Sequence, residues 1–277
     1  IAINSIVSPG DRVLVTGFEH NSVMRVLDHL GANIQFYGTD LFDKEATIRS
    51  LKEKLTPDTK CVIANHVSNV FGFIQPIYEI SDICHEAGVP FIIDVSQSAG
   101  VMNIDQKRLD AAFLAMPGHK SLLGPQGTGV LISNYKTKPI LYGGTGSVSE
   151  LISMPDFILK KGTDRIFAHE MYLKRRLKEK VSEMPFIKAY FSDDESCQLG
   201  VISMNFEGMD CEEFAGRLSD GGVAVRAGLH CSPMAHKFAG TLGTGTVRVS
   251  LGVFNNENEV QRFAKFLANM NLSVKDR

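Results

Sequence analysis

Cysteine is scarce in this sequence, and its pattern excludes two kinds of protein. The five cysteines are odd in number, widely spaced and free of any CxxC pair, at Cys61, Cys84, Cys197, Cys211 and Cys231. Neither a disulfide-stabilised secreted scaffold nor a zinc knuckle fits this spacing, so no metal site is expected. We therefore expect a reducing compartment, most simply the cytoplasm.

The sequence also lacks an excess of either charge and any long hydrophobic run. Its formal net charge is −2, with acidic and basic residues interspersed, which argues against binding to nucleic acid or to a membrane surface. No apolar run approaches the roughly 18 residues of a membrane span, and the first residues show no signal-peptide pattern. We expect a small-molecule substrate. Because the chain begins with Ile1 rather than Met, we also expect a fragment or a processed chain.

Short apolar runs alternate with helix-like segments through the first half of the chain. The runs include "RVLVTG", "CVIANHV", "PFIIDVS" and "AAFLAM", and segments such as "NSVMRVLDHLGA" and "IYEISDICHEAG" separate them. This alternation predicts an α/β fold built of βαβ units, with a mostly parallel sheet covered by helices. Pro76 is placed to begin one of the helices and Gly88 to end it.

The pattern changes in the second half of the chain. A charged helix, "HEMYLKRRLKEKVSEM", leads into short strands such as "VAVRAG" and "TVRVSLG" and a terminal helix. We therefore predict a large α/β domain over residues 1–165 and a smaller C-terminal α+β domain over residues 166–277. The Gly/Ser-rich segment "LYGGTGSVSELISMPDF" between them is expected to be an irregular loop that touches a partner.

Three polar clusters follow predicted strands of the first domain. They are "EHNS" at residues 19–22, "DVSQSAG" at residues 94–100 and "GHK" at residues 118–120. In an open α/β sheet, ligands bind at the carboxyl ends of the strands. Lys120 follows the apolar run Ala111–Met116 and is expected at that edge. Taken singly, Lys120 also fits a solvated loop lysine, and Asp94 also fits a helix N-cap.

One cofactor, pyridoxal phosphate, would make use of all three clusters together. A lysine amine forms a Schiff base with its aldehyde, and a carboxylate opposite the pyridine nitrogen keeps that nitrogen protonated. A histidine can stack on the ring, and backbone N–H groups at a helix N-terminus can bind the phosphate. The convergence of lysine, aspartate and histidine therefore favours a cofactor site over three unrelated loops.

Six blocks of the sequence resemble the class V aminotransferase family of pyridoxal-phosphate enzymes. They are "GDRVLVTGFEHNSVMR", "NHVSNVFGFIQPI", "FIIDVSQSAG", "PGHKSLLGPQGTGVL", "VRAGLHCSPMAHK" and "GTVRVSLGVFNNENEV", in the order of the family. The match is strongest to cysteine desulfurases and selenocysteine lyases. The resemblance implies the large and small domains of a fold type I enzyme, and it implies a homodimer.

The resemblance also implies a role for each matching residue. It makes Lys120 the Schiff-base lysine, Asp94 the partner of the pyridinium nitrogen, Gln97 the donor to the phenolic oxygen, His20 the ring-stacking residue, His119 a phosphate contact and Asn69 a neighbour of the substrate or the phenolic oxygen. Thr145, in the loop "GGTGS", would help to hold the phosphate of a partner subunit. Without the resemblance, His20 and His119 would be ordinary loop histidines and Asn69 a turn residue.

Two arginines and one cysteine complete the implied site. Arg248, assisted by Arg226, would bind the carboxylate of an amino-acid substrate, as guanidinium groups do. Cys231 would be the thiol that takes the substrate sulfur and becomes a persulfide. On the residues alone, Arg248 also fits a surface ion pair and Cys231 a structural cysteine.

The chain departs from the family at three places. Family members carry, before the residue that is Ile1 here, a strand and a turn that hold the cofactor phosphate. Pro117 stands where the family usually has Ser or Thr, and it cannot donate to a phosphate. The family block "E-x-G-T-x-N" is here "KKGTDR", and the helix expected after it is largely missing. We therefore expect an N-terminal truncation and an internal deletion.

These observations lead to one main hypothesis and two alternatives. The main hypothesis is a pyridoxal-phosphate-dependent cysteine desulfurase that converts L-cysteine to L-alanine and passes the sulfur to an acceptor protein. The residues leave open an aminotransferase or a selenocysteine or β-lyase, for which Cys231 would be incidental. They also leave open a truncated, non-catalytic homologue that keeps the fold.

Overall fold

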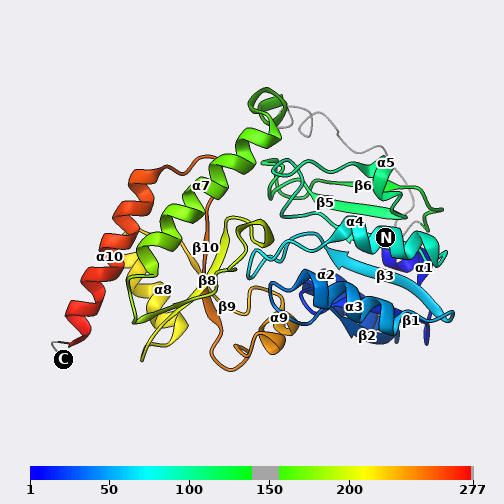
Figure 1. Ribbon diagram of the computed structural model, residues 1–277, viewed down its shortest axis with the longest axis horizontal. Helices are drawn as coiled ribbons and strands as arrows, with labels where there is room; N and C mark the ends of the chain where they lie inside the picture. The colour runs from blue at the N-terminus through cyan, green and yellow to red at the C-terminus, as the bar shows by residue number, and fades with distance from the viewer. Residues whose placement is uncertain (139–155, 276–277) are drawn as a thin grey trace.

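Six strands from the first half of the chain form one sheet in the order β2-β1-β3-β4-β5-β6. This computed structural model describes residues 1–138 and 156–275, with side chains to residue 270 (Figure 1). The strands are β1 (Arg12–Thr16), β2 (Asn33–Tyr37), β3 (Thr59–Asn65), β4 (Phe91–Asp94), β5 (Phe113–Pro117) and β6 (Gly129–Ser133). Strands β1 to β5 are parallel, and β6 is antiparallel to β5. The predicted α/β fold with a mostly parallel sheet is confirmed.

Both faces of this sheet are covered by helices. The helices are α1 (Ala2–Ile6), α2 (Asn21–His29), α3 (Lys44–Lys54), α4 (Ile77–Glu86) and α5 (Gln106–Leu109). Strand β1 shows the two faces: Val13 and Val15 pack in one apolar cluster with α1 and α2, whereas Leu14 packs in another with α3 and α4. Burial of both faces explains why the strands are continuous apolar runs rather than alternating ones.

The expected boundaries of α4 are confirmed. Pro76 is its N-cap residue, where the missing N–H of proline costs no helical hydrogen bond. Gly88 follows the helix with a φ of +66°, a left-handed conformation that glycine adopts without strain. Local backbone preferences thus account for both ends of α4.

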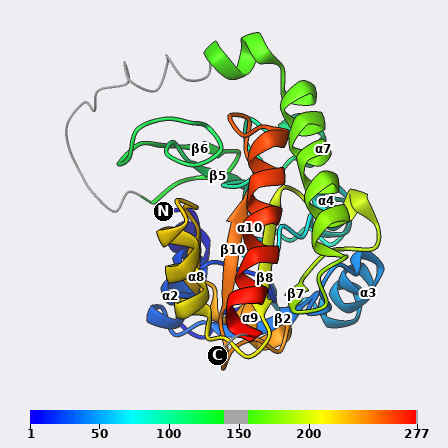
Figure 2. The ribbon, with the colours of Figure 1, turned by 90° about the vertical axis from the view of Figure 1, so that its left-hand side faces the viewer.

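The second half of the chain forms an antiparallel sheet of four strands, in the order β7-β8-β10-β9. Its strands are β7 (Ile187–Ala189), β8 (Val201–Phe206), β9 (Arg226–Gly228) and β10 (Thr246–Ser250), and the helices around it are α7 (Thr163–Val181), η1 (Glu195–Cys197), α8 (Cys211–Asp220), α9 (Pro233–Phe238) and α10 (Glu257–Lys275). Leu177, Phe214 and Leu267 pack the three long helices against Ile202 of the sheet. Helices α7 and α10 lie side by side (Figure 2).

The predicted domain boundary, between residues 165 and 166, falls in the first turn of α7. Helix α7 contributes to the apolar cluster of the second sheet. The division itself stays a prediction.

The segment after β3 joins the two sheets. The Ser203 hydroxyl on β8 donates to the Val70 carbonyl at 2.8 Å, and the Gln198 side chain donates to the Phe71 carbonyl at 2.9 Å. Gly72 has a φ of +68°, and a Cβ there would lie 2.4 Å from the Val201 carbonyl oxygen, so this close approach requires glycine. The contact fixes Asn69 between the two sheets.

Candidate active site

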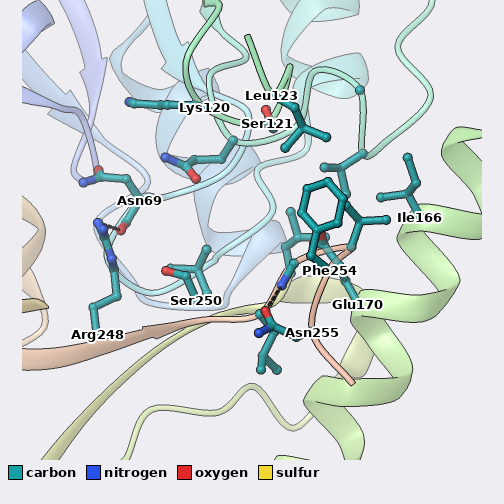
Figure 3. A pocket seen from close by; sticks show the side chains of 18 of the residues that line it. Asn69, Lys120, Ser121, Leu123, Ile166, Glu170, Arg248, Ser250, Phe254 and Asn255 are labelled. Atoms are coloured by element: carbon teal, nitrogen blue, oxygen red, sulfur yellow. Dashed lines mark hydrogen bonds between the residues drawn. The ribbon is translucent and has the colours of Figure 1, made fainter. Parts of the chain in front are cut away.

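Residues from both sheets line one cavity of about 390 Å³. From the large sheet come residues that follow β1, β3, β4 and β5, and from the small sheet come two arginines: His20, Asn69, Gln97, Lys120, Arg226 and Arg248. Figure 3 shows Lys120 on one wall, with Asn69 and Arg248 together on another. The structure thus brings six of the predicted site residues to the carboxyl edge of the sheet, where ligands bind in such folds.

Lys120 lies in the turn after β5 and is half-buried. The turn is held by backbone hydrogen bonds from Gly118 to Thr128 and from Gly124 to Gly118, at 2.8 and 2.6 Å. Burial lowers the pKa of the Lys120 amine, and the nearby Arg248 lowers it further, although Asp94 opposes the shift. Within the described residues, the amine forms no hydrogen bond or ion pair. The Lys120 amine is therefore partly desolvated and has no protein partner in the described part of the chain.

Asp94 is the last residue of β4 and half-buried. Its Oδ1 accepts the Ser96 backbone N–H at 2.8 Å and the Ser96 hydroxyl. Residues 95–100 form turns, and α5 begins only at Gln106. The alternative of a helix N-cap is therefore wrong. Asp94 lines a second cavity of about 810 Å³, which shares His20, Lys120 and Arg226 with the first.

The two predicted histidines have different surroundings. His20 is the N-cap of α2, where its Nδ1 accepts the Ser22 backbone N–H at 3.1 Å. Burial, followed by the charge of Lys120, lowers the pKa of His20, so its ring is neutral at neutral pH. His119 is exposed and lines the larger cavity. A fixed, neutral ring at His20 is compatible with stacking on a flat ligand.

The two predicted arginines form a pair. Arg226 on β9 and Arg248 on β10 are cross-strand partners. Arg248 donates to the Asn69 carbonyl at 2.9 Å, whereas its buried Nε has no hydrogen-bond partner among the described residues. Burial, followed by the charge of Arg226, lowers the pKa of Arg248. The alternative of a surface ion pair for Arg248 is wrong, because no ion pair of residues 1–138 or 156–270 includes it.

Cys231 lies beside this arginine pair. Its thiol is half-buried, and the Nη2 of Arg226 lies 3.5 Å from its Sγ. The neighbouring His230 is buried, and its Nε2 lies 3.0 Å from the Thr246 carbonyl oxygen. Burial lowers the pKa of His230 to about 3, so it carries no charge near the thiol at neutral pH. Arg226 is thus the cation that contacts Cys231.

Sequence reasoning gave no role to Glu19, which lies next to His20. Glu19 is fully buried, and its Oε1 accepts the Thr16 hydroxyl at 2.5 Å and the Asn65 N–H at 2.6 Å. Its Oε2 has no partner among the described residues. Burial raises the pKa of Glu19 to about 8. The signal in the sequence was an acidic residue directly after the apolar run "VLVTGF".

A second buried acid was also missed. Glu170 on α7 is 7% exposed and lines the smaller cavity, on the side away from Arg248 (Figure 3). Burial raises its pKa to about 7. Its signal was weak, because a glutamate in a charged helix is usually solvated.

Thr145, the last of the predicted site residues, lies outside the described residues. Of the helices in the described part of the chain, none has the length and apolar character needed to cross a membrane. Residues 1–138 and 156–275 contain no group of three or more His, Cys, Asp or Glu side chains arranged to bind a metal.

Comparison with known proteins gives a consistent result. The family model described as aminotransferase class-V matches residues 1–153 and 134–263. A probable cysteine desulfurase of Halobacterium salinarum is 30% identical, over 92% of this chain and 68% of that protein. One of Pyrococcus abyssi is 29% identical, over 99% of this chain and 76% of that protein.

Solved structures agree with these sequence matches. The apo structure of a cysteine desulfurase from Thermococcus onnurineus superposes with a TM-score of 0.84 and 29% identity, over 95% of this chain and 73% of that one. A cysteine desulfurase from Escherichia coli, 21% identical, has the same fold, with a TM-score of 0.81 over 95% of this chain and 72% of that one. The chain is thus shorter than the proteins that it resembles.

Proposed function

The chain belongs to the aminotransferase class-V family, and we propose from this membership and its site that it is a pyridoxal-phosphate-dependent cysteine desulfurase. One observation carries the proposal. Arg226 stands opposite Arg248 and also contacts the Cys231 thiol, with Nη2 3.5 Å from Sγ. This contact supports a carboxylate site at the two arginines, which line a cavity together with Lys120, next to a sulfur nucleophile.

The residues present fit pyridoxal phosphate. Lys120 has an amine without a protein partner among the described residues, and Asp94, His20 and His119 line the same larger cavity. We assign Lys120 to the cofactor aldehyde, Asp94 to the ring nitrogen, Gln97 to the phenolic oxygen, His20 to the ring face and His119 to the phosphate. Thr145 is assigned to the phosphate in a partner subunit. The bound cofactor supplies an electron sink that stabilises negative charge on the substrate carbon.

The two arginines bind and orient the substrate. A carboxylate between Arg226 and Arg248 receives charge-assisted hydrogen bonds and neutralises the repulsion between the two cations. Arg248 is fixed for this role by its hydrogen bond to the Asn69 carbonyl. Lys120 is the group that moves protons, because burial lowers the pKa of its amine and makes the neutral base more accessible.

Cys231 takes the sulfur of the substrate. The carbon–sulfur bond of L-cysteine breaks, and a sulfur–sulfur bond forms at the Cys231 Sγ. L-cysteine and the enzyme thiol thus give L-alanine and an enzyme persulfide, which balances in atoms and electrons. The persulfide then passes its sulfur to a thiol of an acceptor protein.

The assembly and location belong to the same proposal. We assign the protein to the cytoplasm, where its free thiols would stay reduced. We also propose a homodimer. The exposed apolar side chains of Val130 and Ile132 on the edge strand β6 are consistent with a covered surface there.

The experiment is a product assay on the cofactor-loaded protein with L-cysteine and excess dithiothreitol. Equal amounts of alanine and sulfide are expected, because dithiothreitol reduces the persulfide and regenerates the thiol. Pyruvate and ammonia would instead indicate a β-lyase, and amino transfer to an added keto acid an aminotransferase. A protein that retains no cofactor on gel filtration would be a non-catalytic homologue.

A further inference from the structure

The loop that carries Cys231 is held in an unfavourable backbone conformation. His230 and Cys231 have φ values of +50° and +60°. Residues other than glycine rarely adopt this left-handed region, and two in succession persist only where surrounding contacts hold them. The loop lies between β9 and α9, so neither regular element by itself fixes its conformation.

Asn69 contacts the loop on both sides of Cys231. Its Nδ2 donates to the His230 carbonyl at 2.8 Å, and its Oδ1 accepts the Ser232 hydroxyl at 2.8 Å. Asn69 is 6% exposed, and both partners are buried. A single amide thus binds the residue before the thiol and the residue after it.

The backbone of Asn69 makes a separate contact. Its carbonyl oxygen accepts a hydrogen bond from Nη1 of Arg248 at 2.9 Å. A further hydrogen bond runs from the Asn21 N–H to the Cys231 carbonyl at 2.8 Å. Replacing the Asn69 side chain would therefore remove the hydrogen bonds to the thiol loop but retain the backbone acceptor of Arg248.

We propose that Asn69 is a positioning residue that holds Cys231 against Arg226 in the left-handed loop. The inference rests on the proposed function, in which Cys231 carries the sulfur. It assigns to the Asn69 side chain the positioning of the nucleophile, a role beyond its predicted place near the substrate or the phenolic oxygen. Without its two hydrogen bonds, the loop would relax to more favourable backbone conformations, and the thiol would move away from Arg226.

The first test measures the loop without any turnover. The cofactor-loaded parent, Asn69→Ala and Ser232→Ala are treated with iodoacetamide. The rate at which the Cys231 thiol is alkylated is measured by peptide mapping. Several-fold faster labelling of Cys231 is expected in both variants, because the half-buried thiol becomes more accessible. Asn205→Ala is the matched control, since Asn205 donates to the Gly245 carbonyl at 3.0 Å and not to this loop. Labelling at the parent rate in both test variants would overturn the proposal.

The second test separates positioning from substrate binding. With L-cysteine, kcat is expected to fall by on the order of tenfold to a hundredfold in Asn69→Ala, since small misplacements of a reacting group have effects of this size. KM should stay close to that of the parent, because the backbone acceptor of Arg248 remains. A raised KM with unchanged kcat would overturn the proposal in favour of direct substrate contact.

A double variant and a folding control complete the design. Asn69→Ala combined with Ser232→Ala should label no faster than Asn69→Ala alone, because both changes remove the same hydrogen bond. Additive effects of the two substitutions on the labelling rate would count against the proposal, because the two side chains would then not act through one hydrogen bond. If circular dichroism shows that Asn69→Ala does not fold, Ser232→Ala decides by the same criteria. The labelling result does not depend on desulfurase activity, so failure of the proposed function is seen separately in the product assay.

Discussion

Arg226 and Arg248 lie directly opposite each other on antiparallel strands β9 and β10. Like charges in this position destabilise a sheet. No carboxylate in residues 1–138 or 156–270 forms an ion pair with either of them. Burial, followed by the charge of Arg226, lowers the pKa of Arg248, so an anion bound by both guanidinium groups would relieve an unfavourable arrangement. This relationship supports the proposal that the pair binds a carboxylate.

The first prediction concerns this carboxylate site. Arg248→Lys should raise the KM for L-cysteine by about 10- to 100-fold, because a hydrogen bond to a charged group contributes about 1.5–3 kcal/mol. Lysine keeps the charge but loses the planar fork that binds a carboxylate. Steady-state kinetics provide the measurement, with Arg25→Lys, an exposed arginine on α2, as the control. A KM equal to that of the parent would remove Arg248 from substrate binding.

The second prediction concerns the covalent attachment of the cofactor. Borohydride reduction of the cofactor-loaded protein, followed by peptide mapping, should place the cofactor on Lys120. Lys120→Ala should abolish both the label and turnover, because the substitution removes the reactive amine. Lys107→Ala, on the exposed surface of α5, should leave both intact. Label on a different lysine would show that Lys120 has been assigned wrongly.

The third prediction separates cofactor binding from sulfur transfer. Cys231→Ser should keep the cofactor, because Lys120, Asp94 and Gln97 are unchanged, but should lose steady-state alanine release. Near neutral pH, a serine hydroxyl cannot replace the thiolate that attacks the substrate sulfur. Alanine is measured by amino-acid analysis. The control is Cys197→Ser, which should retain alanine release. Its hydroxyl can replace the thiol that contacts Asp194 at 3.3 Å. Desulfuration at the parent rate by Cys231→Ser would make the β-lyase or aminotransferase hypothesis the better one.

The fourth prediction concerns the stability of the protein as a function of pH. Burial raises the pKa of Glu19 from its ordinary value of 4.5 to about 8 in the folded protein. The folded state therefore binds more protons than the unfolded state between these values, and stability falls as pH rises from about 5 to 8. In Glu19→Gln, which cannot ionise, this loss should be smaller, by on the order of 1–3 kcal/mol.

Urea unfolding at pH 5.5 and 8.5 measures this difference. Comparing the variant with the parent at each pH cancels the other titrating groups, including Glu170, whose raised pKa acts in the same direction. Glu207→Gln, at an exposed position, is the control. A parent and a Glu19→Gln variant with the same pH dependence would show that Glu19 is not protonated in the folded state.

Much of the fold and part of the site could be predicted from the sequence. The alternation of apolar runs and amphipathic segments predicts the parallel sheet, because burial of both faces requires continuous apolar strands. Pro76 and Gly88 mark the ends of α4 through local backbone preferences. The position of Lys120 at the carboxyl edge also follows from local sequence, since it comes directly after a buried strand.

The contacts among these residues depend on the tertiary fold. Asn69 contacts His230 and Ser232 from 161 and 163 positions away, and Arg248 reaches Asn69 across 179 positions. Such contacts depend on how the small sheet docks on the segment after β3, and no local pattern encodes that docking. The low pKa of His230 follows from burial in the folded chain and not from its neighbours in sequence. Local sequence sets which chemical groups are available, whereas packing of the two sheets sets their neighbours, their solvation and their charge.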